Sequence, residues 1–390
     1  MSVNSYVIEA EALFDGTGAA PRAASVLVRD GLIEALRAPG GFAGLARLHV
    51  SVLAPGFVDL QINGAADAQF NDAPEPETLR RIACGAAEGG TAWCLPTFIT
   101  APGRAYARAL DAARAALDSA TPGVIGLHLE GPFLSPRRPG IHPPKAIRPL
   151  DEADFALLEA PGPGARLITV APETIGPKAV ARLVAAGWTV FAGHSEASHA
   201  EALAASGAGL SGATHLFNAM SQITPREPGL VGAVLSGALP YAGVIADGHH
   251  VHPENLRLAA QALGAGRLCL VTDAMLTLAG TRRSFAIGER EVTLKNGRLV
   301  DADGTLGGAH LAMDQAVRNM IDMAGVLPQD AIRMASATPA DVIGLGDSIG
   351  HIAPGYRAGL VVMDEALHVQ ATISDGAVLY DPHGLLSGLA

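Results

Sequence analysis

Histidines and a carboxylate occur in this sequence where short apolar runs end. Glu130 ends the run GVIGLHLE, His194 follows WTVFAG, and His215 lies in GATHLF. One carboxylate and two imidazoles form a ligand set suited to a catalytic zinc or similar divalent ion, because three protein ligands leave one coordination position for water. A lone histidine near an apolar strand is more often a hydrogen-bonded core residue. Three such residues at equivalent run ends favour a metal site.

Two more residues could perform the proton transfers of a hydrolysis. Asp273 ends the run RLCLVTDA, where a carboxylate could take a proton from water and pass it to a leaving amine. The alternative is an aspartate that caps the next helix. His142 lies in the Pro- and Gly-rich segment EGPFLSPRRPGIHPP, which cannot be a helix interior and could aim an imidazole at a carbonyl oxygen. Taken alone, His142 is more often a surface-loop histidine.

A local basic cluster could bind an anionic substrate. Arg226 in TPREPG, with His249 and His250 in ADGHHV, is the best candidate, because a guanidinium offers phosphate a planar fork of donors. An exposed loop arginine is usually only solvated, and chemistry alone does not separate the two histidines. The chain as a whole has a net charge of -11 and a pI near 5.6, which argues against nucleic-acid or anionic-membrane partners.

Eight apolar runs could position these residues. From about Leu53 onward they alternate with Ala-rich stretches of helical periodicity, which is typical of repeated βα units. The runs are SVLAPGFVDLQI, GTAWCLPTFI, GVIGLHLEGP, RLITVAPE, WTVFAGHS, GATHLFNA, YAGVIADG and RLCLVTDA. Eight parallel strands with crossover helices close into a (β/α)8 barrel, whose enzymes place their chemistry at the carboxyl ends of the strands. Gln61, Asn63, Asp247 and His250 also fall at such ends.

The two ends of the chain differ from this repeat. Residues 1–52 and about 347–390 contain short strands and Asp-Gly turn signals, which favour a small β-sandwich built from both termini. Residues 53–346 would then form the catalytic barrel. The segment RSFAIGEREVTLKNGRLV follows the eighth strand and is expected to form a hairpin beside the active-site mouth.

Other features bear on cellular context. The first residues lack a signal-peptide pattern, and no apolar run approaches membrane-spanning length, so we expect a soluble cytoplasmic protein. Cys84, Cys94 and Cys269 have no CxxC spacing, which favours reduced thiols over a disulfide framework or a thiolate metal site.

Taken together, the motifs resemble a known family. PGFVDLQING, HLEGPFLSPRRPGIH, GHSEASH, GATHLFNAM, PREPGLVG, VIADGHHVHPENL, VTDAM and GTLGGAHLAMD occur in the order seen in N-acetylglucosamine-6-phosphate deacetylases of the amidohydrolase superfamily. The resemblance covers the barrel almost end to end, and HLEGPF, THLFNAM and REPG discriminate best. It implies a metal-dependent hydrolase that converts N-acetyl-D-glucosamine 6-phosphate to D-glucosamine 6-phosphate and acetate.

The resemblance also implies roles for single positions. Glu130, His194 and His215 would bind one divalent metal per subunit, with zinc expected first and iron, manganese or cobalt as alternatives. Asp273 would act as general base and then acid, and His142 would face the acetyl carbonyl. The implied sugar-, phosphate- or acetyl-binding residues are Ile141, His142, Asn218, Ala219, Arg226, Asp247, Gly248, His249, His250, Leu306, Gly307 and Gly308. A homodimer is implied, since family phosphate sites can include a residue of a second subunit.

The sequence departs from relatives at two places. Gln61 and Asn63 stand where many amidohydrolases carry a His-x-His pair for a second metal, so a vacated second-metal position and a single ion are expected. Ala309 and Ala312 replace small hydroxyl residues near the implied acetyl pocket. Two alternatives stay open: an amidohydrolase for another substrate, such as N-acetylgalactosamine 6-phosphate or an N-acyl compound, and a barrel that binds a sugar phosphate without turnover.

Overall fold

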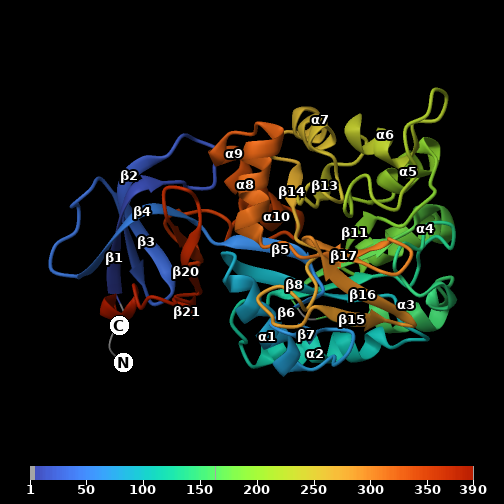
Figure 1. Cartoon of the computed structure of the whole chain (residues 1–390), viewed down its shortest axis with the longest axis horizontal. Helices are drawn as coiled ribbons and strands as arrows, with labels where there is room; N and C mark the ends of the chain where they lie inside the picture. Colours follow the sequence, from blue (N-terminus) through green and yellow to red (C-terminus); the bar gives the residue numbers. More distant parts are fainter. Residues whose placement is uncertain (1–4, 163, 390) are drawn as a thin grey trace.

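A parallel barrel dominates the structure, a computed structural model that describes residues 5–162 and 164–389, and a separate sheet lies beside the barrel (Figure 1). Neighbouring barrel strands follow one another in sequence and pair in parallel. The strands are β5 (Phe57–Ile62), β8 (Thr91–Ile99), β9 (Gly126–Glu130), β10 (Ala165–Val170), β11 (Thr189–Ala192), β12 (Gly212–Ala213), β13 (Tyr241–Val244) and β14 (Leu268–Leu270). Each coincides with one of the eight apolar runs, although β10 begins one residue before its run, so the predicted barrel is confirmed.

Hydrogen bonds beyond the last strand close the barrel. The Asp273 amide donates to the Gln61 carbonyl at 2.8 Å, and the Asn63 amide donates to the Ala274 carbonyl at 2.8 Å. Beneath this seam, the buried Asp59 carboxylate accepts a hydrogen bond from the Thr272 hydroxyl. The first and eighth strand ends are therefore held together at the carboxyl rim.

Helices cover the outside of the barrel. Every residue of β8 is buried, as expected for a strand with the barrel interior on one face and helices on the other. The helices that follow successive strands are α1 (Pro76–Ala87), α2 (Tyr106–Asp118), α3 (Glu152–Leu158), α4 (Pro172–Ala185), α5 (His199–Gly207), α6 (Gly229–Leu235) and α7 (Pro253–Leu263), and the chain later forms α8 (Met313–Ala324), α9 (Pro328–Ala335) and α10 (Ala337–Val342). A short 3-10 turn, η1 (Pro144–Ala146), interrupts the long loop after β9.

The second sheet combines the two ends of the chain. Its strands are β1 (Ser5–Leu13), β2 (Arg22–Arg29), β3 (Leu32–Arg37), β4 (Ala46–Pro55), β19 (Leu360–Met363), β20 (Val369–Ser374) and β21 (Ala377–Tyr380), followed by the 3-10 turn η2 (Ser387–Leu389). They form one seven-stranded sheet in the order β21-β20-β19-β4-β1-β2-β3, with its own apolar core. A sheet domain from both termini is therefore confirmed, while the proposed division at residues 52 and 347 stays a prediction; β4 runs on to Pro55.

Small strands surround the mouth of the barrel. A two-stranded ribbon, β6 (Gly64–Ala65) and β7 (Ala68–Gln69), follows the first barrel strand. The insertion after the eighth strand is larger than the predicted hairpin, because it forms a four-stranded antiparallel sheet of β15 (Ser284–Ile287), β16 (Arg290–Lys295), β17 (Arg298–Val300) and β18 (Leu306–Ala309). The Ala309 amide donates to the Asp273 carbonyl at 2.8 Å, which attaches β18 to the rim.

Two negative findings concern the described residues. None of the helices in this part of the chain is long and apolar enough to cross a membrane. Cys84, Cys94 and Cys269 are all free thiols, as expected, and the last two are buried.

Candidate active site

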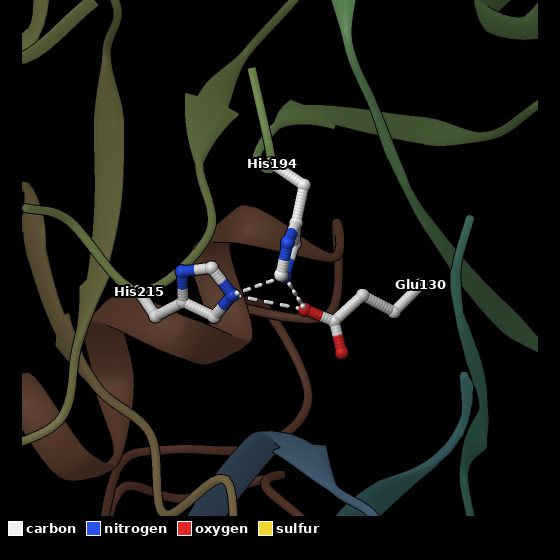
Figure 2. A group of neighbouring side chains, drawn as sticks. All are labelled: Glu130, His194 and His215. Carbon is white, nitrogen blue, oxygen red and sulfur yellow. Dashed lines mark hydrogen bonds and ion pairs between the residues drawn. The ribbon is translucent and has the colours of Figure 1, made fainter. Parts of the chain in front are cut away.

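Glu130, His194 and His215 meet at the carboxyl rim of the barrel (Figure 2). The His215 Nε2 atom lies 2.9 Å from Glu130 Oε1 and 3.1 Å from His194 Nε2, and His194 Nε2 lies 3.3 Å from Glu130 Oε1. All three side chains are buried. The predicted ligand set therefore converges on one point, although its members come from three different strand ends.

Unusual backbone conformations turn these side chains inward. His194, His215 and Asp273 have φ values of 47°, 33° and 49°, in the left-handed region that few residues other than glycine adopt. Such conformations cost about 1–3 kcal/mol each and concentrate at functional sites. The three rim residues share this strain, which indicates that the fold is built to present them.

The geometry fits a divalent cation. Ligand atoms bonded at about 2.0–2.1 Å to a tetrahedral ion stand about 3.3 Å from one another, close to the three separations found here. His194 Nδ1 lies 2.9 Å from the Arg138 carbonyl, which can only accept, so Nδ1 carries the proton and Nε2 keeps a free lone pair. Within the described part of the chain, the ion-pair partners of Glu130 are histidines alone. The carboxylate and the two imidazoles therefore fit a bound cation.

Asp273 lies beside the ligand set and is held by two amides. Asn63 Nδ2 donates to Asp273 Oδ1 at 2.6 Å, and Gln61 Nε2 donates to the same oxygen at 3.1 Å. Gln61 Nε2 also lies 3.3 Å from Glu130 Oε1. The side-chain amides of Gln61 and Asn63 therefore donate hydrogen bonds that orient the carboxylates of Asp273 and Glu130. This role does not require a second metal ion.

His142 approaches the site from the loop after β9. Its Nε2 lies 3.8 Å from Glu130 Oε2, and its Nδ1 lies 2.9 Å from the Thr100 hydroxyl. The ring centroid lies 4.3 Å from that of His194, with the two ring planes tilted by 53°, and the loop is fixed by a 2.8 Å hydrogen bond from the Ser135 amide to the His194 carbonyl. The interpretation of His142 as a surface histidine is wrong, because the side chain is buried.

Burial and charge set the proton affinities of the site. Burial raises the pKa of Asp273 to about 6, with the negative charge of Glu130 adding to the effect. Burial also opposes the charge of Glu130, but its close contacts with the imidazoles of His194 and His215 outweigh it and hold the pKa of Glu130 well below its usual range. Burial lowers the pKa of His142 to about 3, so this ring is neutral near pH 7. Glu130 is thus ionised, whereas Asp273 has a pKa close enough to neutral pH to accept and return a proton.

A cavity of about 300 Å³ opens above these residues. Of the residues that the resemblance implicated in substrate binding, those that line the cavity are Ile141, His142, Asn218, Ala219, His250, Leu306 and Gly308. The structure separates the two adjacent histidines that chemistry could not: His250 lines the cavity with its Nδ1 2.7 Å from Asp247 Oδ2, whereas His249 is exposed. Asp247 therefore supports His250 from behind.

Besides Asp247 and His249, three further implicated residues are absent from the cavity lining. Arg226 is exposed in the loop before α6, Gly248 lies beside Met323, and Gly307 lies close to Ile141. Among the described residues, the lining contains no lysine or arginine. The basic cluster of Arg226 with His249 and His250 therefore stays a prediction.

The sequence reasoning missed several residues of the site. Thr100 directly follows β8, a strand end for which no polar residue was singled out, and its hydroxyl contacts His142; its rim position was the signal that could have found it. The apolar residues Ile99, Ile245, Met275 and Ile287, which line the cavity, were missed as well. No sequence signal marks these four, because apolar residues at strand ends are equally typical of a core.

Comparisons with known proteins agree with this geometry. The chain is 40% identical over 334 residues to an N-acetylgalactosamine-6-phosphate deacetylase of Shewanella sp. (strain ANA-3), covering 86% of this chain and 84% of that protein. It is 38% identical over 348 residues to the human N-acetylglucosamine-6-phosphate deacetylase, covering 84% and 83%. The crystal structure of the N-acetylglucosamine-6-phosphate deacetylase from Pasteurella multocida superimposes with a TM-score of 0.92 at 32% identity, covering 96% of this chain and 99% of that one.

The family match covers most of the chain. Residues 52–379 match the amidohydrolase family, a range that includes the whole barrel and every residue of the ligand set. A mutant deacetylase from Mycobacterium smegmatis, whose structure contains N-acetyl-D-glucosamine 6-phosphate, superimposes with a TM-score of 0.88 at 29% identity, covering 96% and 99% of the two chains. The metal-ligand geometry, the fold and these matches together show that this chain belongs to the amidohydrolase family.

Proposed function

We propose that this protein hydrolyses N-acetyl-D-glucosamine 6-phosphate to D-glucosamine 6-phosphate and acetate, with one divalent metal ion per subunit. The observation that carries the proposal is the convergence of Glu130, His194 and His215 next to a carboxylate with a pKa of about 6. The named activities of the relatives supply the substrate class.

The metal supplies one part of the chemistry. When bound, a divalent ion provides Lewis-acid chemistry that lowers the pKa of water and polarises a carbonyl. Glu130, His194 and His215 would hold it through one oxygen and two Nε2 atoms. Zinc is the first candidate, and iron, manganese and cobalt share these ligand preferences.

Asp273 and His142 would move and hold protons on either side of the amide. Asp273 would accept a proton from the attacking water and return it to the amine nitrogen as the carbon–nitrogen bond breaks. His142 would donate from Nε2 to the carbonyl oxygen, where negative charge develops. The Thr100 hydroxyl can donate either to His142 Nδ1 or to the Glu130 carbonyl, 3.1 Å away. Donation to Nδ1 would hold the proton of the neutral ring on Nε2.

A test of the proposal compares substrates and metal content. Purified protein is incubated with N-acetylglucosamine 6-phosphate and with its unphosphorylated form, and free amine is measured beside the metal content. We expect amine release from the phosphorylated compound in proportion to bound metal. The alternative of a non-catalytic sugar-phosphate binder would give binding without amine release, and that result would refute the proposal.

A second candidate substrate is N-acetylgalactosamine 6-phosphate. The relative with 40% identity is named for this epimer. The two sugars differ only in the configuration of one hydroxyl, so both belong in the same assay. If kcat/KM were at least about tenfold higher for the galactosamine form, that form would be the preferred substrate in place of the glucosamine form.

A homodimer would complete the phosphate site. Within the described residues, the cavity lining has no cationic side chain, while Arg226 is exposed in a neighbouring loop. A phosphate needs such a partner, and a second subunit could bring an arginine to the rim. Light scattering should give twice the mass of one chain, and Arg226→Ala should raise KM for the phosphorylated substrate steeply.

A further inference from the structure

The cavity has a polar side and an apolar side. Asn218 and His250 are among its polar lining residues. An apolar wall is formed by Ile99, Ile141, Met275, Ile287 and Leu306, and Ile245 is a further apolar lining residue. Most of this wall belongs to a distinct cluster in which the rim packs against the insertion sheet. The two sides therefore suit two chemically different parts of a substrate.

The proposed substrate has the same division. Its sugar carries hydroxyls and a phosphate, whose burial without hydrogen-bond partners is unfavourable. Its acyl group ends in a methyl, whose transfer from water into apolar surroundings is favourable. With the amide carbon held between the ligand set, Asp273 and His142, the sugar faces the polar side and the acyl group faces the apolar wall.

We propose that Met275 forms the end of the acyl pocket and thereby restricts the enzyme to short acyl groups. This inference rests on the proposed function and names a specificity-determining residue for it. Met275 follows Asp273 by two positions and is buried, with 1% of its surface exposed. Its side chain lines the cavity and belongs to the apolar cluster that forms the wall.

Contacts on several sides hold this methionine in place. Its amide donates to the Ala309 carbonyl at 3.1 Å, and the Gln69 amide nitrogen lies 3.9 Å from its sulfur. Gly308 has a φ of +69°, and a Cβ atom there would stand 2.6 Å from Met275 Cγ and Sδ. The glycine thus lets the thioether lie directly against the backbone of β18. An unbranched side chain that is fixed in this way acts as a wall, although methionine is flexible elsewhere.

Shortening this side chain should lengthen the pocket. Met275→Ala removes the Cγ, Sδ and Cε atoms of a residue that lines the cavity. One methylene that fits or fails to fit an apolar pocket changes the specificity ratio about 10- to 200-fold. We therefore expect the ratio of kcat/KM for N-butyryl over N-acetyl substrate to rise at least about tenfold in the variant.

The experiment measures amine release from the N-acetyl, N-propionyl and N-butyryl forms of glucosamine 6-phosphate. It compares the unaltered enzyme, Met275→Ala and the matched control Met320→Ala, which truncates a buried methionine of α8 in the main core. Ile287→Ala, on the insertion strand β15, shortens the same wall from another element and serves if Met275→Ala does not fold. We expect the butyryl-to-acetyl ratio to rise in Met275→Ala and Ile287→Ala and to stay constant in Met320→Ala.

The outcomes separate the inference from the function beneath it. The role of Met275 is overturned if the unaltered enzyme hydrolyses the N-acetyl substrate but the butyryl-to-acetyl ratio of kcat/KM is unchanged in folded Met275→Ala and Ile287→Ala. That result leaves the proposed function intact. An equal rise in Met320→Ala also overturns the role of Met275, because general loosening would then explain the change. No amine release by the unaltered enzyme from any of the three compounds overturns the proposed function and this inference together.

Discussion

Asn63 offers the sharpest test of how the rim prepares Asp273. The Asn63 side chain donates the shorter of the two amide hydrogen bonds to Asp273 Oδ1, at 2.6 Å, and Gln61 donates the longer one at 3.1 Å. Asn63→Ala removes the shorter bond and leaves the metal ligands in place. We expect a loss of kcat with metal binding retained, because Asp273 would no longer be fixed toward the water it must deprotonate.

The size of the effect follows from the kind of hydrogen bond. A bond to a charged group contributes about 1.5–3 kcal/mol, and each 1.36 kcal/mol of barrier changes the rate about tenfold. The expected loss in kcat is therefore about 10- to 150-fold. Because Gln61 still donates to the same oxygen, the lower half of this range is the better expectation. KM should change less, since Asn63 acts through Asp273.

The assay is steady-state amine release with metal content and thermal unfolding measured on the same preparations. Asn255→Ala, on the exposed face of α7, is the control for a lost asparagine that does not line the cavity. A kcat within about twofold of the unaltered enzyme, with one metal per chain retained, would show that Asp273 does not depend on this amide. Loss of metal together with activity would instead assign Asn63 to the ligand set, which also contradicts the reasoning.

Three further outcomes can be measured on the same protein. Thr100→Val should lower kcat about tenfold and Thr100→Ser should restore it, because His142 Nδ1 lies 2.9 Å from this hydroxyl; equal rates in the two variants would refute the role. His215→Ala should drop the metal content, measured by mass spectrometry, well below one per chain with the circular dichroism unchanged, since two ligands remain. Asp154→Asn should lower the free energy of unfolding by about 1–3 kcal/mol at pH 7. Burial opposes the charge of Asp154, but Arg148 and the Asp151 cap outweigh it and lower its pKa, so the contribution exists above the unfolded-state pKa and the difference should shrink as the pH falls below about 4. A difference independent of pH in chemical denaturation would contradict it.

The barrel was predictable because its signal is repeated along the chain. Each apolar run had to be a strand buried on both faces, and β8 shows this pattern at all nine of its residues. The ligand set was predictable for a related reason: parallel strands place their carboxyl ends at one rim, so Glu130, His194 and His215 could be grouped before their distances were known. Position along the chain was enough for this part of the site.

Other parts of the site depend on packing that a sequence pattern does not carry. His249 and His250 are neighbours of the same type, and only the bond from His250 to Asp247 at 2.7 Å decides which of them faces the cavity. The insertion was expected as a hairpin, but β18 adds a fourth strand because its backbone pairs with the rim at Asp273 and Met275. That pairing joins residues over thirty positions apart, so no local turn signal announces it.

The metal site depends on backbone strain that only the folded barrel can maintain. In a strand, successive side chains alternate between the barrel interior and the surrounding helices. A rim residue that continued this alternation would point to the centre of the barrel only if its position in the strand fell on the interior face. His194, His215 and Asp273 instead leave their strands in left-handed conformations, at a cost of about 1–3 kcal/mol each. The hydrogen bonds of the rim, such as those from the Asp273 amide to Gln61 and from the Ser135 amide to His194, oppose relaxation of that strain. The same closure that completes the barrel therefore fixes the direction of these rim side chains.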